Sequence, residues 1–161
     1  MLPGVKKILY ASDIEKGSRP AFRAAVSLCG HYDAQITYLH VLGNEHQDNM
    51  VLQSLLKDDS MREVYDESLE NLRDKLSERI ERFFKDEVEE IEMLKVEQVR
   101  SIIRVGKPWE VIVDVANEID ADVIVMGTRP HSSLGHVLIG STATKVMHNA
   151  DRPILIIPLE K

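Results

Sequence analysis

The chain has 161 residues, of which 43% are hydrophobic and 29% are charged, and its formal net charge is −7. This length and apolar fraction fit one folded domain, residues 1–161, and exclude an intrinsically disordered chain. The excess of negative charge repels nucleic acid and anionic lipid, so neither is an expected partner, although a locally basic pocket could still hold a phosphate. No apolar run approaches the roughly 20 residues that span a bilayer, so no membrane segment is expected.

The single cysteine, Cys29, limits the redox and metal chemistry that the chain can support. One thiol forms neither an internal disulfide nor a multi-cysteine zinc site. Because apolar residues surround Cys29 in the sequence, we expect a buried structural thiol. Residues 1–5 contain neither a long apolar stretch nor a cleavage pattern, so we expect a cytoplasmic protein in a reducing compartment.

Hydrophobic patterning in the first half of the chain predicts strands that alternate with amphipathic helices. Ser18 is a candidate N-cap for the first helix, and Pro20 is tolerated in the first turn. Apolar residues between positions 61 and 83 recur every three or four residues, which predicts a long helix with a charged, solvated opposite face. In chain order, the predicted elements are a strand at 7–11, a helix ending at Gly30, a strand at 36–42, a polar loop at 43–50 and a helix at 61–83.

The second half of the chain continues the same alternation. Gly106 and Pro108 end a strand and start a helix, with Pro108 near the first helical position. The segment 121–127 is apolar enough to be a strand that is buried on both faces. The predicted elements are a strand at 96–105, a helix from Pro108 to Ile119, a strand at 121–127, a helix at 141–149 and a strand at 153–158.

The order of these elements predicts an α/β fold with a doubly wound, five-stranded parallel sheet. Strands that alternate with crossover helices form parallel sheets, because each crossover places a helix on one face. Ligands of such sheets bind outside the carboxyl ends of the strands, at the point where the strand order reverses. That rule indicates two segments of this chain, Ala11-Ser12-Asp13 and the residues that follow Met126.

The segment from Gly127 to Thr142 leaves a buried strand and ends at the start of a helix. Its small residues permit close approach of a ligand, and a helix start presents N–H groups to an anion. Arg129 adds positive charge. The segment does not contain a standard phosphate loop, because Ser141 stands where the lysine of G-x-x-x-x-G-K-S/T is required, and no G-x-G-x-x-G exists in the chain. A P-loop ATPase and a nicotinamide dehydrogenase are therefore excluded.

The same segment resembles the motif G-x2-G-x9-G-S/T of the nucleotide-binding branch of the universal stress proteins. The match rests on Gly127, Gly140 and Ser141. Further similarities cover essentially the whole chain, at 7–13, 39–41, 105–108 and 153–157. The resemblance implies a Rossmann-like fold of the adenine nucleotide alpha hydrolase-like type.

The resemblance also implies a ligand, an adenine nucleotide, with ATP first and AMP or another adenosine nucleotide as alternatives. Asp13 would contact the ribose, Val41 the adenine, and Gly140 with Ser141 the phosphates. Magnesium on the phosphates is a further candidate, although no protein ligand set for it is visible. Two further residues, Arg129 and His131, are included among the predicted binding residues because of their charge and position, and not because of the resemblance. The predicted binding residues are Ala11, Ser12, Asp13, Val41, Met126, Gly127, Arg129, Pro130, His131, Gly140, Ser141 and Thr142.

One position of the motif departs from the family pattern, because its second glycine falls on Pro130. Proline has no N–H to donate, and its φ is fixed near −65°. Two hypotheses therefore stay open. The chain is a stress-response sensor or switch whose loop binds nucleotide in an altered shape, or it is a nucleotide-free dimeric stress protein that acts through an unknown protein partner.

Catalysis is not expected. His131 and His136 could be imagined as a metal pair or as bases for a nearby serine, but their spacing is unspecific and no orienting carboxylate is evident. Weak ATP hydrolysis is the least favoured hypothesis, because neither a general base nor an arginine finger is recognisable. Asp13 could instead cap a turn, and Ser141 would serve as a helix N-cap without any ligand.

The last predicted strand indicates how the protein assembles. It is short and apolar, and an exposed apolar edge strand is a liability unless it is covered. Members of the resembled family commonly pair this strand across a twofold axis. We therefore expect a homodimer through residues 152–159.

Overall fold

The computed structural model describes residues 4–13, 17–43, 56–88, 94–129 and 139–159. The five strands form one parallel sheet in the order β3-β2-β1-β4-β5, so the strand order reverses between β1 and β4. The elements are β1 (Lys7–Ala11), α1 (Arg19–Tyr32), β2 (Gln35–Gly43), α3 (Asp59–Glu87), the 3-10 helix η2 (Val96–Gln98), β3 (Val99–Gly106), α4 (Pro108–Glu118), β4 (Val123–Thr128), α5 (Ser141–Asn149) and β5 (Ile154–Pro158).

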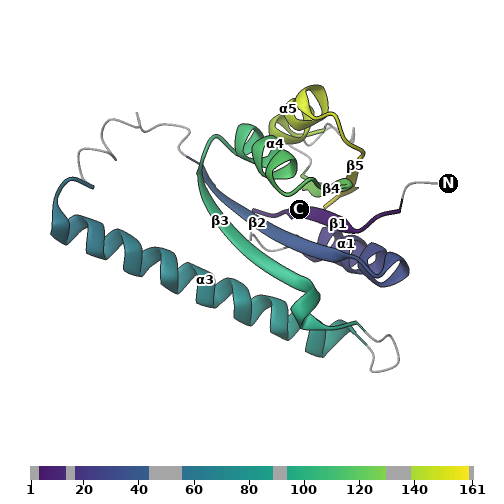
Figure 1. The fold of residues 1–161 in the computed structure, drawn as a ribbon, viewed down its shortest axis with the longest axis horizontal. Helices are drawn as coiled ribbons and strands as arrows, with labels where there is room; N and C mark the ends of the chain where they lie inside the picture. The colour runs from purple at the N-terminus through teal and green to yellow at the C-terminus, as the bar shows by residue number, and fades with distance from the viewer. Residues whose placement is uncertain (1–3, 14–16, 44–55, 89–93, 130–138, 160–161) are drawn as a thin grey trace.

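Helices cover both faces of the sheet (Figure 1). In that view α4 and α5 lie above the strands, and α1 and α3 lie below them. Alternate residues of β1 enter different cores: Tyr10 stacks on Phe22 in the core on the α1 side, whereas Leu9 belongs to the core that contains Val146 of α5. The predicted doubly wound α/β fold is confirmed, and β4 is buried on both faces as its apolar run indicated.

Several predicted boundaries differ from the structure, and two of these differences have a clear local cause. Residues 96–98 form the 3-10 helix η2 instead of the start of a strand, because Gln98 accepts from the Lys95 N–H at 2.9 Å and donates to the Ala34 carbonyl at 3.0 Å. The first helix continues beyond Gly30 to Tyr32, and the C-cap residue that follows, Asp33, has a left-handed φ of 48°. The thiol of Cys29 is buried as predicted, and it donates to the Ala34 carbonyl at 3.0 Å.

The long helix α3 uses only part of its apolar stripe. Its buried residues, Leu76, Ile80 and Phe83, all lie in the C-terminal half. Met61, which belongs to the predicted stripe, has 43% of its surface exposed. Asp58 is the N-cap of the helix, and its carboxylate accepts from the N–H groups of Ser60 and Met61. No helix in the described residues is long and apolar enough to cross a membrane.

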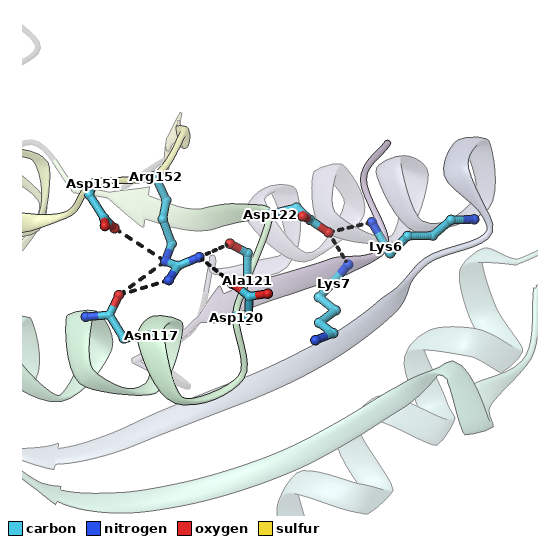
Figure 2. A network of polar contacts seen from close by, with 8 residues as sticks. All are labelled: Lys6, Lys7, Asn117, Asp120, Ala121, Asp122, Asp151 and Arg152. Atoms are coloured by element: carbon cyan, nitrogen blue, oxygen red, sulfur yellow. Dashed lines mark hydrogen bonds and ion pairs between the residues drawn. The ribbon is translucent and has the colours of Figure 1, made fainter. Parts of the chain in front are cut away.

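Polar contacts fix the sheet at the end opposite the carboxyl ends of the strands (Figure 2). The Arg152 guanidinium, which precedes β5, donates to the Ala121 carbonyl at 2.7 Å and to Asn117 Oδ1 at 3.0 Å. The Asp122 carboxylate accepts from the backbone N–H groups of Lys6 and Lys7 at 2.7 and 2.8 Å. These contacts join the chain before β1, β4 and β5.

The hydrogen bonds to Asp122 predict a pH-dependent contribution to stability. The backbone N–H of Lys6, and then that of Lys7, hold the pKa of this carboxyl below its ordinary value of 3.8. We expect Asp122→Asn to lower the free energy of unfolding by about 1 kcal/mol at neutral pH, the usual net worth of such hydrogen bonds. Because the folded pKa is depressed, this contribution is complete above pH 3.8 and is lost as the pH falls through the folded value.

Urea denaturation at pH 7, 5 and 3 measures this difference. Asp114→Asn, at an exposed position of α4, is the matched control and should change stability little at any of these pH values. A difference between the wild-type protein and Asp122→Asn that stayed constant from pH 7 to pH 3 would contradict the assignment.

Candidate functional site

A cavity of about 340 Å³ opens at the carboxyl ends of β1 and β4. This is the point where the strand order reverses, because β1 pairs with β2 on one side and with β4 on the other. Open parallel sheets place their ligands there. The volume lies in the range of small-molecule sites, about 300–1,000 Å³.

Every predicted binding residue that the structure describes lines this one cavity. They come from three segments that are far apart in the sequence: the end of β1, the end of β2, and the end of β4 with the start of α5. Pro130 and His131 lie outside the described residues, as does His136. The residues brought together are Ala11, Ser12, Asp13, Val41, Met126, Gly127, Arg129, Gly140, Ser141 and Thr142.

Asp13 and Arg129 form an ion pair at the cavity. Arg129 Nε donates to Asp13 Oδ2 at 3.0 Å, and Arg129 Nη2 donates to Oδ1 at 3.4 Å. The Arg129 side chain is 20% exposed and the Asp13 side chain 45%. Sequence reasoning treated these residues as separate ligand contacts, with Asp13 at a ribose and Arg129 at a phosphate. The structure instead joins them across 116 positions of the chain.

Ser12 is held in place by the end of β2. Its N–H donates to the Leu39 carbonyl at 3.0 Å, and its own carbonyl lies 2.8 Å from His40 Nδ1. Because a carbonyl oxygen only accepts, this contact places a proton on Nδ1. His40 therefore fixes the segment that presents Asp13.

Thr128 joins the two ends of the segment 129–139. Its buried hydroxyl accepts from the Gly140 N–H at 2.9 Å. Gly140 is the N-cap of α5, and Ser141 is the first helical residue, so Ser141 is not the N-cap that its residue type favours. The first turn of α5 lines the cavity through Ser141, Thr142 and Ala143. The first N–H groups of a helix have no partner within it, so this end of the cavity favours an anion.

Buried hydroxyl groups support the cavity on the side of α1. Ser18 stands at the N-cap position of α1, but its hydroxyl makes no capping bond and accepts from Arg79 of α3 at 2.5 Å. The Tyr10 hydroxyl donates to the Ser18 carbonyl at 3.3 Å. Burial is the main cause that raises the pKa of Tyr10, so this hydroxyl stays protonated and remains a donor.

Several residues that line the cavity were missed by sequence reasoning. Tyr10 and Thr128 carry hydroxyl groups within otherwise apolar strands, which is the one local signal that could have singled them out. Arg79 does not line the cavity but donates to Ser18, which does, and it belongs to a charge run whose predicted role was a solvated face. The other apolar residues of the wall have no local signal, because they come from β2 and α4: Leu39, Pro108 and Ile112.

Gly127 has a packing role that the motif does not reveal. It lies inside β4, and Leu159, the buried residue after β5, packs against it. A Cβ atom built on Gly127 would lie 2.8 Å from Leu159 Cγ and would also overlap Leu159 Cδ1. The absence of a side chain at Gly127 therefore lets Leu159 close the cavity wall.

The described residues contain no group of three or more histidine, cysteine, aspartate or glutamate side chains that could hold a metal ion. Asp13 is the one carboxylate among the described residues that line the cavity, and Arg129 binds it. These residues do not fit a protein-held magnesium site.

Comparison with known proteins decides the family. The model of the universal stress protein family matches residues 4–158. The chain belongs to the universal stress protein family. This confirms the resemblance seen in the sequence, while membership of the nucleotide-binding branch stays a prediction.

Relatives match most of the length of this universal stress protein. Universal stress protein MJ0577 of Methanocaldococcus jannaschii is 27% identical over 153 residues, which cover 94% of each chain. The structure of universal stress protein UspA from Lactobacillus plantarum matches with a TM-score of 0.70 at 22% identity, covering 97% of this chain and 99% of that one. A universal stress protein from Archaeoglobus fulgidus, in complex with dAMP, matches with a TM-score of 0.59 at 21% identity, covering 96% and 98%.

The contact between Gly127 and Leu159 predicts that a small side chain at position 127 of β4 destabilises the folded protein. We expect Gly127→Ala to lower the free energy of unfolding by about 1–3 kcal/mol, because the added methyl group overlaps a buried leucine. Urea denaturation measures this cost. Gly4→Ala is the matched control, since a Cβ at Gly4 meets nothing within 4 Å.

A double-mutant cycle with Leu159→Ala tests the cause. Truncating Leu159 removes the overlapping atoms, so the cost of Gly127→Ala should become smaller in that background. An unchanged cost would show that Leu159 is not the reason for glycine at this position.

Proposed function

We propose that this universal stress protein binds an adenine nucleotide, with ATP as the first candidate, and acts as a sensor or switch in the stress response through the occupancy of its cavity. One observation carries the proposal. Three features meet in a single cavity at the switch point of the sheet: the Asp13 carboxylate, the Arg129 guanidinium and the first turn of α5.

The two sides of the cavity suit the two ends of a nucleotide. The side formed by β2, β4 and α4 is apolar, with Leu39, Met126 and Ile112 in its wall, and suits a base. The same cavity also presents Arg129 and the start of α5, which suit phosphate groups. Asp13 supplies acceptor oxygens for sugar hydroxyls.

A related structure supports the class of ligand. The universal stress protein of Archaeoglobus fulgidus that shares this fold forms a complex with dAMP, an adenine nucleotide. We extend this to ATP because the helix start beside Arg129 suits a chain of phosphates. Magnesium would reach the site on the phosphates of the nucleotide, since the described residues offer no ligand set for it.

We propose binding without catalysis. The described residues that line the cavity include neither a histidine nor a lysine, and the Asp13 carboxylate is bound to Arg129. Hydrolysis of a phosphoanhydride needs a group that orients water and a cation set on the transferred phosphoryl. A weak hydrolase is accordingly the less favoured alternative.

A nucleotide-free protein is the second candidate function, and the observation that favours it is Pro130 in place of the second motif glycine. In that case the protein would act as a dimer on a protein partner. Mass spectrometry of the small molecules released from freshly purified, denatured protein separates the two functions.

Binding is best tested by calorimetric titration with ATP and AMP. We expect dissociation constants in the micromolar range for the wild-type protein. Ser141→Glu should weaken ATP binding by about tenfold or more, because its carboxylate repels phosphate, while a negative charge at a helix start favours folding. Pro130→Gly should raise the affinity if the loop alone is altered.

Ser60→Glu is the matched control for Ser141→Glu. It makes the same change in the first turn of α3, which does not line the cavity, so ATP affinity should stay at the wild-type level. Release of no nucleotide from the purified protein, together with no heat for wild type and Pro130→Gly, would overturn nucleotide binding.

We also propose a homodimer through β5. This strand is at the edge of the sheet, and Leu155 leaves 36% of its surface exposed. Unpaired backbone groups and apolar side chains of an edge strand favour pairing with a second copy. The proposed pairing segment stays residues 152–159, in which β5 spans Ile154–Pro158.

Sedimentation velocity tests the assembly. The wild-type protein should sediment with twice the chain mass of 18.3 kDa. Leu155→Lys places a charge on the edge strand and should give a monomer, whereas Val64→Lys, at an exposed position of α3, should leave the dimer intact. A wild-type monomer at micromolar concentration would contradict the proposal.

A further inference from the structure

The helix α3 holds the wall of the cavity from behind. No residue of α3, all of which the structure describes, lines the cavity itself. Arg79 of α3 nevertheless donates to the hydroxyl of Ser18, which lines the cavity at the start of α1. Ser18 is 2% exposed, and a hydroxyl buried to this degree needs a hydrogen-bond partner. A charged donor from α3 is one such partner.

Polar contacts continue from Ser18 to the strands that carry the candidate site. The Tyr10 hydroxyl of β1 donates to the Ser18 carbonyl at 3.3 Å. Hydrogen bonds also join the hydroxyl groups of Tyr10 and Tyr38 to the side chain of Ser12, which lines the cavity. A continuous set of polar contacts therefore leads from Ser12 through Ser18 to Arg79.

Aromatic rings make a second connection between the cavity wall and α3. The ring of Tyr10 stacks on Phe22 of α1, with 5.2 Å between the ring centroids. Phe22 also contacts Phe83 of α3, with 4.4 Å between the centroids. Arg23 of α1 pairs with Glu87 of α3 at 2.7 Å. The C-terminal half of α3 is thus joined to the wall by packing as well as by polar contacts.

We propose that Arg79 is a positioning residue for the cavity wall, and that α3 responds to the occupancy of the cavity through it. The inference rests on the proposed nucleotide site. It names the element of the fold in which a sensor based on occupancy would change.

The physical basis is linkage between two sets of contacts. A ligand that lies against Tyr10 and Ser18 favours one arrangement of these side chains, and the contact with Arg79 favours the same arrangement. Two contacts that stabilise one arrangement strengthen each other by the same factor. A bound ligand therefore suppresses local opening of α3, and loss of Arg79 weakens ligand binding.

The packing of α3 makes such a response measurable. Its buried residues are only Leu76, Ile80 and Phe83, so few apolar contacts oppose local opening of this 29-residue helix. These three residues lie in the same half as Arg79. A gain in the stability of the wall therefore changes the opening of the C-terminal half, whereas the first turns of α3 stay as they are.

Hydrogen exchange of the wild-type protein, with and without saturating ATP and magnesium, is the first test. ATP shields no amide of α3 directly, because α3 does not line the cavity. We expect ATP to slow exchange at residues 76–87 by about fivefold or more, the lower end of ordinary coupling between two sites. Residues 59–70 of the same helix should keep their rates.

Variants of Arg79 test the cause. Arg79→Ala should weaken ATP binding in calorimetry by about fivefold or more, by the same linkage, and should abolish the slowing at residues 76–87. Arg82→Ala is the matched control, since Arg82 is an exposed arginine on the same helix, and it should keep both. Arg79→Lys retains a charged donor and should recover part of the response.

A merely structural role of Arg79 would lower the melting temperature of Arg79→Ala and leave the response of α3 to ATP in place. If Arg79→Ala fails to fold, Ser18→Ala breaks the same hydrogen bond from the other side. It should abolish the same slowing at residues 76–87.

The outcomes separate this inference from the proposed function. ATP binding by the wild-type protein with unchanged exchange throughout α3 would overturn the inference and leave the proposed function in place. A folded Arg79→Ala variant with the wild-type affinity and the wild-type response of α3 would do the same. If the wild-type protein gave no heat with ATP and released no nucleotide, the proposed function itself would fall, and this inference with it.

Discussion

The pairing of β1 with β4 is the constraint on which the site depends. Ala11 lies opposite Met126 in the register of these strands, so the residues that follow each of them emerge side by side at the carboxyl edge. The helices that leave these two strands lie on opposite faces of the sheet. That divergence opens the cavity, and it brings Asp13 within hydrogen-bonding distance of Arg129.

Side chains from outside the strand ends give the cavity its shape. The Thr128 hydroxyl at the end of β4 accepts from the Gly140 N–H at the start of α5. This hydrogen bond holds the first turn of α5 at the cavity. Arg79 reaches from α3 to Ser18, so the longest helix of the fold contacts the wall on the side of α1. The opposite end of the sheet is held by Asp122 and Arg152, through contacts that leave the carboxyl edge open to a ligand.

Sequence patterns predicted the elements and the candidate residues because both depend on local information. Apolar periodicity located the strands, and the rule for parallel sheets pointed to Asp13 and to the segment after Met126. Pairwise contacts were not predictable, since the partners of Arg129 and Arg79 lie 116 and 61 positions away. The contact of Gly127 was not predictable either. Its place in the motif indicated a ligand contact, whereas in the structure a side chain at this position would meet Leu159.

The strand β5 connects the two proposals about assembly and binding. Its outer edge is the proposed dimer surface, and the residue after it, Leu159, lies in the cavity wall against Gly127. The Leu159 N–H donates to the Thr128 carbonyl at 2.8 Å, next to the hydroxyl that holds α5. Pairing of β5 with a second copy would therefore act directly on the backbone that positions Arg129. The proposed dimer edge and the cavity wall are therefore connected by one short, continuous set of contacts through Leu159.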